Sequence, residues 1–272
     1  MTMRKPRVLI PSGFGLNCER ETAYTYSVVG ADAYIVHIND LIANPRMLEE
    51  YQIIDFIGGF SDGDHFGSGK VHKNRLKQKA LADELDKFIK EGKLVIGVCN
   101  GFQFMAKYGM LPGFYGDYKT QRMTLVGNDS GKFEDRWVHL GVNPDSSCVW
   151  TKGIKELYLP VRHGEGKIRA SDPTVLDRLE QNNQVVLRYI DPRNGNPTME
   201  YPYNPNGSDR AIAGVCDPTG LVFGKMPHRE AYWSPYNNPN WPRLKIDGKL
   251  PKEGAGLQIS RNGVEYARKN LI

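Results

Sequence analysis

Short runs of consecutive apolar residues alternate with longer amphipathic stretches over the first hundred residues. The apolar runs predict strands at 7–10, 34–38, 51–57 and 93–98. The stretches with helical spacing are 17–29, 72–90 and 101–108. Strands that are apolar throughout are typical of sheets buried on both faces. This order predicts an α/β fold with a mostly parallel open sheet and helices on both of its faces.

The second half of the chain is richer in strands and turns. Strands are predicted at 122–126, 137–142, 156–161, 184–190, 211–216 and 221–225, and a short helix at 173–180. After Trp233 the composition shifts to Pro, Asn, Lys and Gly, and the hydrophobic periodicity is weak. We therefore predict one domain over 1–234 and a basic C-terminal extension over 235–272, packed on the domain or on a partner.

Charge is unevenly distributed along the 272 residues, whose formal net charge is +5. The segment from Trp241 to Ile272 holds seven basic and three acidic residues, so the rest of the chain is nearly neutral. No series of basic residues interleaved with aromatics runs through this neutral part, which disfavours nucleic acid as a partner. No apolar stretch approaches the roughly 20 residues of a membrane span, and the N-terminus has no secretory signal core.

Four cysteines, Cys18, Cys99, Cys148 and Cys216, lie far apart in the sequence. They form no C-x-x-C pair, so neither a metal site nor a dense disulfide framework is predicted. Free thiols in a protein of ordinary size fit a reducing compartment, and we expect a cytoplasmic protein.

The segment 95–103 places Cys99 between a predicted buried strand and a predicted helix, inside the pattern G-x-C-x-G. This pattern is the sulfur form of the nucleophile elbow, a strained turn that presents a nucleophile at the end of a strand. Gly97 and Gly101 allow the strand and the helix to pack closely, and a helix N-terminus favours negative charge on the sulfur. The N–H of Asn100 would face a developing oxyanion. The alternative is a buried structural cysteine at a strand end.

A cysteine nucleophile needs a base, and six histidines are available. His72 lies among lysines and arginines of a predicted helix, where a solvent-exposed face is the simplest interpretation. His228 follows the last predicted strand, in the sequence Met-Pro-His-Arg-Glu. Residues two apart in extended backbone point to the same side, so Glu230 can orient the His228 ring. Without the elbow, an ordinary exposed His-x-Glu pair would be the interpretation.

Two glycine-containing loops follow predicted strands, at 58–64 and at 162–167. Ligands of parallel sheets gather beyond the carboxyl ends of the strands, and glycine lets backbone N–H groups approach them. A flexible loop is the alternative for 58–64. The pattern of a phosphate-binding P-loop does not occur in the sequence, so no ATP site is predicted in this chain.

Together these segments resemble the triad-type (class I) glutamine amidotransferases, and more narrowly the glutaminase subunit or domain of phosphoribosylformylglycinamidine synthase. The matching pieces are Gly-Leu-Asn-Cys-Glu-Arg-Glu-Thr (15–22), Gly-Gly-Phe-Ser-Asp-Gly-Asp (58–64), Gly-Val-Cys-Asn-Gly-Phe-Gln (97–103), His-Gly-Glu-Gly (163–166), Asn-Pro-Asn-Gly-Ser (204–208) and Met-Pro-His-Arg-Glu (226–230). The resemblance implies a flavodoxin-like three-layer fold and the hydrolysis of glutamine for purine biosynthesis.

The resemblance also implies a catalytic triad. Cys99 would attack the glutamine carboxamide and form a γ-glutamyl thioester, His228 would move the proton, and Glu230 would orient His228. The family's usual Met-Pro-His-Pro-Glu-Arg carries Arg229 and Ala231 here in place of Pro and Arg. The change bears on the shape of the loop and leaves the His and Glu of the triad in place.

Further roles follow from the same resemblance. The N–H groups of Gly59 and Asn100 would form the oxyanion hole, and Gln103 would contact the substrate, L-glutamine. The ammonia would pass to a separate ATP-dependent synthetase subunit, which would hold ATP and magnesium, so no cofactor is expected in this chain. A small accessory subunit is left open as a further partner.

Three alternatives remain open at this point. One is a class I amidotransferase that serves another synthase, against which the segments 163–166 and 204–208 argue. Another is a Cys-elbow hydrolase of the small protease or stress-protein type, without a partner. The third is a non-enzymatic module with an inactive site, which the presence of Cys99, His228 and Glu230 disfavours. We further predict that the basic C-terminal segment, together with the basic residues around 70–79, contacts the synthetase.

Overall fold

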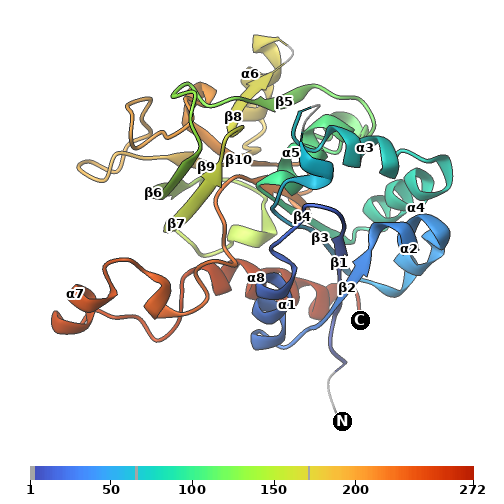
Figure 1. Cartoon of the computed structure of the whole chain (residues 1–272), viewed down its shortest axis with the longest axis horizontal. Coiled ribbons are helices and arrows are strands. Elements are labelled where there is room, and N and C mark those ends of the chain that lie inside the picture. Colours follow the sequence, from blue (N-terminus) through green and yellow to red (C-terminus); the bar gives the residue numbers. More distant parts are fainter. Residues whose placement is uncertain (1–3, 65–66, 171) are drawn as a thin grey trace.

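The computed structural model describes residues 4–64, 67–170 and 172–272 (Figure 1). The strands are β1 (Arg7–Ser12), β2 (Asp32–His37), β3 (Ile53–Phe56), β4 (Leu94–Val98), β5 (Met123–Val126), β6 (Glu134–Val142), β7 (Glu156–His163), β8 (Lys167–Ala170), β9 (Val185–Tyr189), β10 (Ile212–Cys216) and β11 (Val222–Lys225). The α-helices are α1 (Glu19–Val28), α2 (Ile38–Ala43), α3 (Lys70–Leu76), α4 (Lys79–Lys90), α5 (Asn100–Tyr108), α6 (Pro173–Gln181), α7 (Trp241–Ile246) and α8 (Gly256–Asn270). No helix among these residues is long and apolar enough to cross a membrane.

One open sheet holds nine of the strands, in the order β2-β1-β3-β4-β11-β10-β9-β6-β7. The first five strands in this order pair in parallel. The pairs from β11 to β7 are antiparallel, and β5 pairs with β8 in a separate antiparallel ribbon. The predicted α/β fold with an open sheet is confirmed, with its parallel strands gathered in one half.

Helices cover both faces of the sheet, as predicted. Successive side chains of β1 illustrate the two layers, because Leu9 packs in one apolar cluster while Val8 and Ile10 pack in the other. The first cluster includes residues of α2, α3, α4, α5 and α6. The second includes residues of α1 and α8 and the buried Trp150. These three layers leave the carboxyl ends of the parallel strands as the edge where a site can form.

The single helix predicted over 72–90 is wrong, because the structure divides this stretch into α3 and α4. The chain leaves the helical conformation at Gln78, whose φ and ψ are −59° and 131°. The two helices then pack on different neighbours: α3 contacts α5, whereas α4 contacts the 3-10 helix at Pro45–Glu50. A continuous helix could not reach both neighbours, so tertiary packing overrides the continuous helical spacing.

The C-terminal region contains two helices that the weak periodicity did not reveal. The fifteen residues of α8 pack against α1 and against the 3-10 helix at Val149–Thr151. Between the body and α8, residues 239–253 form a projection that includes α7, seen at the far left of Figure 1. None of these fifteen residues is buried. We call residues 239–253 the C-terminal arm.

Candidate active site

Cys99 lies in a sharp turn between β4 and α5. Its φ of 52° and ψ of −109° fall in a region that L-residues rarely adopt. The turn is held from both sides, because the Cys99 N–H donates to the Lys225 carbonyl at 2.9 Å and the Cys99 carbonyl accepts from the Gln103 N–H at 3.0 Å. This strained conformation between a buried strand and a helix is the geometry that the G-x-C-x-G pattern predicts.

Gly101 is the position in the elbow where a side chain would be impossible. A Cβ at Gly101 would overlap the backbone carbonyl of Phe56 on the neighbouring strand β3. A Cβ at the other glycine of the pattern, Gly97, would overlap the Met105 side chain of α5 and lie 2.9 Å from the Gly101 carbonyl carbon. The two glycines therefore allow α5 to begin directly against the sheet, which fixes the position of Cys99.

The Cys99 side chain is buried, with 4% of its surface exposed. Its sulfur lies 3.5 Å from the Arg162 carbonyl oxygen, at the end of β7. The positive end of the α5 dipole also lies at this sulfur. The antiparallel half of the sheet thus supplies one wall of the elbow that the parallel half forms.

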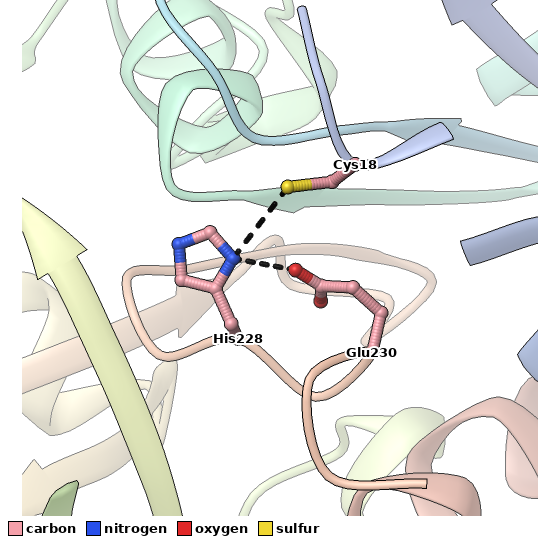
Figure 2. Close-up of side chains that lie close together, drawn as sticks. All are labelled: Cys18, His228 and Glu230. Atoms are coloured by element: carbon pink, nitrogen blue, oxygen red, sulfur yellow. Dashed lines mark hydrogen bonds and ion pairs between the residues drawn. The ribbon is translucent and has the colours of Figure 1, made fainter. Parts of the chain in front are cut away.

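His228 lies in the loop that follows β11, and its backbone N–H donates to the Pro160 carbonyl at 2.8 Å. Its Nδ1 lies 2.5 Å from Glu230 Oε1, as Figure 2 shows. Both side chains are buried. The two-residue spacing therefore places the ring and the carboxylate in contact, as the extended-backbone argument predicts.

Charge outweighs burial at this pair. Burial lowers the pKa of His228, but the carboxylate of Glu230 and the nearby Cys99 hold that pKa well above its usual value. Burial raises the pKa of Glu230, but the His228, Lys225 and Arg229 side chains lower it to about 2. Glu230 is therefore an anion that stabilises positive charge on the His228 ring.

Cys18 is a site residue that the sequence reasoning did not assign. Its sulfur lies 4.0 Å from His228 Nδ1, on the same side of the ring as Glu230 (Figure 2). Burial raises the pKa of the Cys18 thiol. The 15–22 segment matched the family, but 210 positions separate Cys18 from His228, and no local pattern links residues so far apart.

Gly58 explains how these side chains approach one another. A Cβ at this position would lie 2.7 Å from His228 Cε1, 3.3 Å from Cys18 Sγ and 3.5 Å from Cys99 Cβ. The three side chains therefore surround the same glycine, and only a residue without a Cβ leaves room for them. The glycine loop after β3 is thus part of the site, as predicted from its place after a strand.

Gly59 and Asn100, the two expected oxyanion donors, lie on the turns that follow β3 and β4. Among the residues that the structure describes, neither backbone N–H donates a hydrogen bond. The Asn100 side chain is engaged, because its amide donates to Asp64 at 3.1 Å and to Gln103 Oε1 at 3.0 Å. Both N–H groups therefore remain available to a ligand.

Gln103, the expected contact of the substrate, is buried and held at both ends of its amide. Its Nε2 donates to the Glu165 carbonyl at 2.5 Å, and its Oε1 accepts from Asn100. The structure therefore places Gln103 beside the elbow, where it joins α5 to the loop at 162–167. Its contact with substrate stays a prediction.

The loop at 162–167 and the segment at 204–208 meet around His163. The Nδ1 of His163 lies 3.1 Å from Asn128 Oδ1, and Nε2 lies 3.5 Å from Asn206 Nδ2. Burial lowers the pKa of His163 to about 3, so the ring is neutral at physiological pH. His163 therefore supports the loop next to Cys99.

A second buried ion pair anchors the His228 loop, at the position where the family usually has proline. The Arg229 side chain is fully buried and forms an ion pair with Asp55 of β3. Arg229 also donates to the Tyr26 hydroxyl at 3.0 Å, and Tyr26 donates to Asp55 at 2.9 Å. This network joins the loop to α1 and β3.

A pocket of about 550 Å³ opens onto the site. Cys18, His228 and Glu230 line it, together with Gly59 from the glycine loop. Cys99 is not among its lining residues in the described part of the chain. The pocket therefore opens on the side of His228, while Cys99 is covered.

His72 corrects one expectation. The prediction of a solvent-exposed face for this histidine is wrong, since only 4% of it is exposed. Its ring packs edge-on against Phe104 of α5, with the ring centroids 5.2 Å apart. Burial lowers the pKa of His72 to about 4. His72 is therefore a neutral core residue that helps to pack α3 on α5.

Comparison with known proteins agrees with this geometry. The sequence model of the CobB/CobQ-like glutamine amidotransferase domain matches residues 5–267. Over 270 residues the chain is 43% identical to phosphoribosylformylglycinamidine synthase subunit PurQ of Methanococcus maripaludis, covering 97% of this chain and 99% of the relative. The same subunit of Dehalococcoides mccartyi is 44% identical over 267 residues, covering 98% and 100%. The chain belongs to the PurQ family.

A solved structure extends the comparison to three dimensions. A chain of the PurLQS structure from Thermotoga maritima is 27% identical, with a TM-score of 0.70, and the alignment covers 97% of this chain and 99% of that one. The predicted resemblance and the predicted fold are thereby confirmed. The family match runs well into 235–272. The division of the chain at residue 234 and the roles of individual residues stay predictions.

Proposed function

We propose that this chain hydrolyses L-glutamine to glutamate and ammonia, as the glutaminase subunit of phosphoribosylformylglycinamidine synthase. The ammonia would go to an ATP-dependent synthetase that converts formylglycinamide ribonucleotide to formylglycinamidine ribonucleotide. The observation that carries the proposal is the 2.5 Å contact between His228 and Glu230, beside a cysteine in a strained elbow. The names of the PurQ relatives support the acceptor and the partner.

The geometry supports a triad mechanism for the first half of the reaction. The Nδ1 of His228 donates to Glu230, and the charge of Glu230 favours transfer of the Cys99 proton to Nε2. The sulfur then attacks the carboxamide carbon, and the negative oxygen of the tetrahedral intermediate accepts hydrogen bonds from the N–H groups of Gly59 and Asn100. His228 returns its proton to the nitrogen, ammonia leaves, and Cys99 holds a γ-glutamyl thioester.

Water completes the reaction. His228 takes a proton from a water molecule, whose oxygen attacks the thioester carbon. The second tetrahedral intermediate collapses, the bond to the Cys99 sulfur breaks, and His228 returns the proton to that sulfur. Glutamate is released, and the enzyme regains its starting protonation state.

Substitution of the nucleophile tests the mechanism. We expect Cys99→Ala to reduce ammonia release from glutamine to the background rate, because it removes the thiol at the elbow that forms the thioester. Cys216→Ala is the matched control, since Cys216 is buried in the second apolar cluster, away from the elbow. Ammonia release by Cys99→Ala at the wild-type rate would disprove the mechanism.

The acceptor is tested separately from the glutaminase activity. We expect formylglycinamidine ribonucleotide to form from glutamine when the cognate synthetase, ATP and magnesium are added, and the glutaminase rate to rise. A glutaminase that binds the synthetase but transfers no nitrogen to formylglycinamide ribonucleotide would point to another synthase.

We place the reaction in the cytoplasm, where the four free cysteines of the chain remain reduced. An accessory subunit stays a prediction.

A further inference from the structure

Cys18, His228 and Glu230 bring three different metal-binding atoms together at the wall of the pocket. The Cys18 sulfur, a nitrogen of His228 and a carboxylate oxygen of Glu230 all lie within 4.8 Å of one another. Cys18 precedes the first turn of α1, and the other two follow β11. Figure 2 shows the sulfur and the carboxylate directed at the same ring nitrogen, Nδ1.

This ligand set suits a borderline-soft divalent ion. Thiolate, imidazole and carboxylate are the three ligand types that zinc uses in proteins, at about 2.0–2.3 Å from the metal. A site with three protein ligands and one open position is typical of accessible zinc. All three residues line the pocket, so water or a small ligand can occupy the fourth position.

An unused acceptor in the cluster is an independent indication of a cation. The second carboxylate oxygen of Glu230 is buried and has no hydrogen-bond partner within the described residues. Buried carboxylate oxygens normally have a partner, since leaving one without any costs free energy. Oε1 is the oxygen directed at the ring, so a cation bound by both oxygens of the carboxylate would give the second oxygen a partner.

We propose that Cys18, His228 and Glu230 form a site for a divalent ion of the zinc class, and that ion binding switches off the glutaminase. The binding site stands on the geometry alone, whereas the inhibition rests on the function proposed above. Sequence spacing could not reveal the site, because 210 positions separate two of its ligands.

Inhibition follows from the two nitrogens of the His228 ring. The ion would take the Nδ1 lone pair, and Nδ1 would lose the proton that it donates to Glu230. A neutral imidazole has one N–H, which would then have to be on Nε2. Nε2 could no longer accept the proton of Cys99, so thiolate formation would stop. The thiol proton of Cys18 would be released to water as its sulfur binds the ion.

Cobalt binding tests the site without any measurement of activity. The full-length Cys99→Ala protein removes the nucleophile as a competing ligand and still contains Cys18. We expect Co²⁺ to produce a thiolate-to-cobalt charge-transfer band in the near ultraviolet, and Zn²⁺ to abolish it by displacement. The band should disappear in Cys99→Ala/Cys18→Ala and persist in Cys99→Ala/Cys216→Ala. A band that survives the loss of Cys18, or no band in Cys99→Ala, would overturn the proposal.

Two additions keep this experiment decisive. Circular dichroism and thermal unfolding would show that each variant is folded, and Cys18→Ser offers a smaller change of shape with a much weaker ligand. We expect Cys99→Ala/Cys18→Ser to lose the cobalt band as Cys99→Ala/Cys18→Ala does. Retention of the full band by the serine variant would assign the band to another thiol and refute the site.

Zinc inhibition tests the second half of the proposal. We expect Zn²⁺ to inhibit the wild-type glutaminase and a chelator to restore the rate. Cys18→Ala should need at least tenfold more Zn²⁺ for half-inhibition relative to its own metal-free rate, because a direct ligand is lost and loss of an outer-shell partner alone typically weakens metal binding by about 10- to 100-fold. Equal zinc sensitivity of the two proteins would refute the switch. If the protein showed no glutaminase activity, the cobalt result would still decide the site.

Discussion

Two neighbouring stretches of the chain show opposite environments. The segment 226–230, which follows β11, is buried at every position and contains three charged or titratable side chains. The C-terminal arm, residues 239–253, begins a few residues later and has no buried position. The first segment holds the proposed base, and the second projects from the body (Figure 1).

The difference lies in where each stretch finds its partners. Buried charges need specific partners, and the segment 226–230 finds them far along the chain, in Asp55 of β3 and in the Pro160 carbonyl. The ion pairs of the arm join residues close together in the sequence, Arg243 with Asp247 within the arm and Glu253 with Arg261 of α8. The loop conformation is therefore coupled to the whole fold, whereas the arm can change with little effect on it.

The largest effect is expected at the carboxylate of the buried segment. Glu230→Gln keeps the shape of the side chain but removes the charge that holds the proton on His228. We expect kcat for glutamine hydrolysis to fall by about 10²- to 10⁴-fold, the usual contribution of acid–base catalysis. Steady-state ammonia release measures it, with the exposed Glu265→Gln on α8 as the matched control. An unchanged kcat in Glu230→Gln would remove Glu230 from the triad.

Stability should fall most where the buried ion pair is broken. Arg229→Met leaves the fully buried Asp55 carboxylate without its cation, which typically costs about 3–5 kcal/mol in the free energy of unfolding. Arg243→Met in the exposed arm should change it by about 0.5 kcal/mol or less. Urea unfolding followed by circular dichroism compares the two variants. Similar losses in both would mean that burial does not distinguish the two segments.

A third comparison places the arm against the helix that follows it. Ile259 of α8 is fully buried, so Ile259→Ala should cost about 2–5 kcal/mol. Replacement of residues 239–253 by a short Gly-Ser linker should leave the thermal midpoint nearly unchanged, because the arm buries no residue. A large drop in the midpoint for the linker variant would show that the arm supports the fold.

The smallest effect on the isolated chain is expected for a substitution in the C-terminal arm, and this substitution tests whether the arm contacts the synthetase. The arm carries four basic and two acidic residues and exposes Ile246, which is 79% exposed. We expect Ile246→Asp to leave the glutaminase rate of the isolated chain unchanged and to weaken its association with the synthetase. Gel filtration of the mixed subunits measures it. Unchanged complex formation, also with the linker variant, would exclude the arm from that interface.

Much of the body could be predicted because its signals are local. Continuous apolar runs mark the central strands, and the strands predicted at 211–216 and 221–225 correspond to the antiparallel pair β10 and β11. The sequence signals for two features, the break between α3 and α4 and the helix α8, were too weak to predict them. The break between α3 and α4 carries neither Gly nor Pro, and α8 buries Gly256, Ser260 and Gly263 beside its apolar residues. Low helix propensity hid α8, and packing on α1 overcomes it.

The contacts of the candidate site likewise fall into two groups, those that short sequence spacings predict and those that they do not. Cys99 at its elbow and Glu230 beside His228 follow from spacings of a few residues, because backbone geometry alone relates positions so close together. The place of Cys18 next to His228, the Arg229–Asp55 pair and the shared space around Gly58 join residues from distant parts of the chain. Such contacts depend on how the layers pack, and no local periodicity encodes them, so they became visible only once the chain was folded.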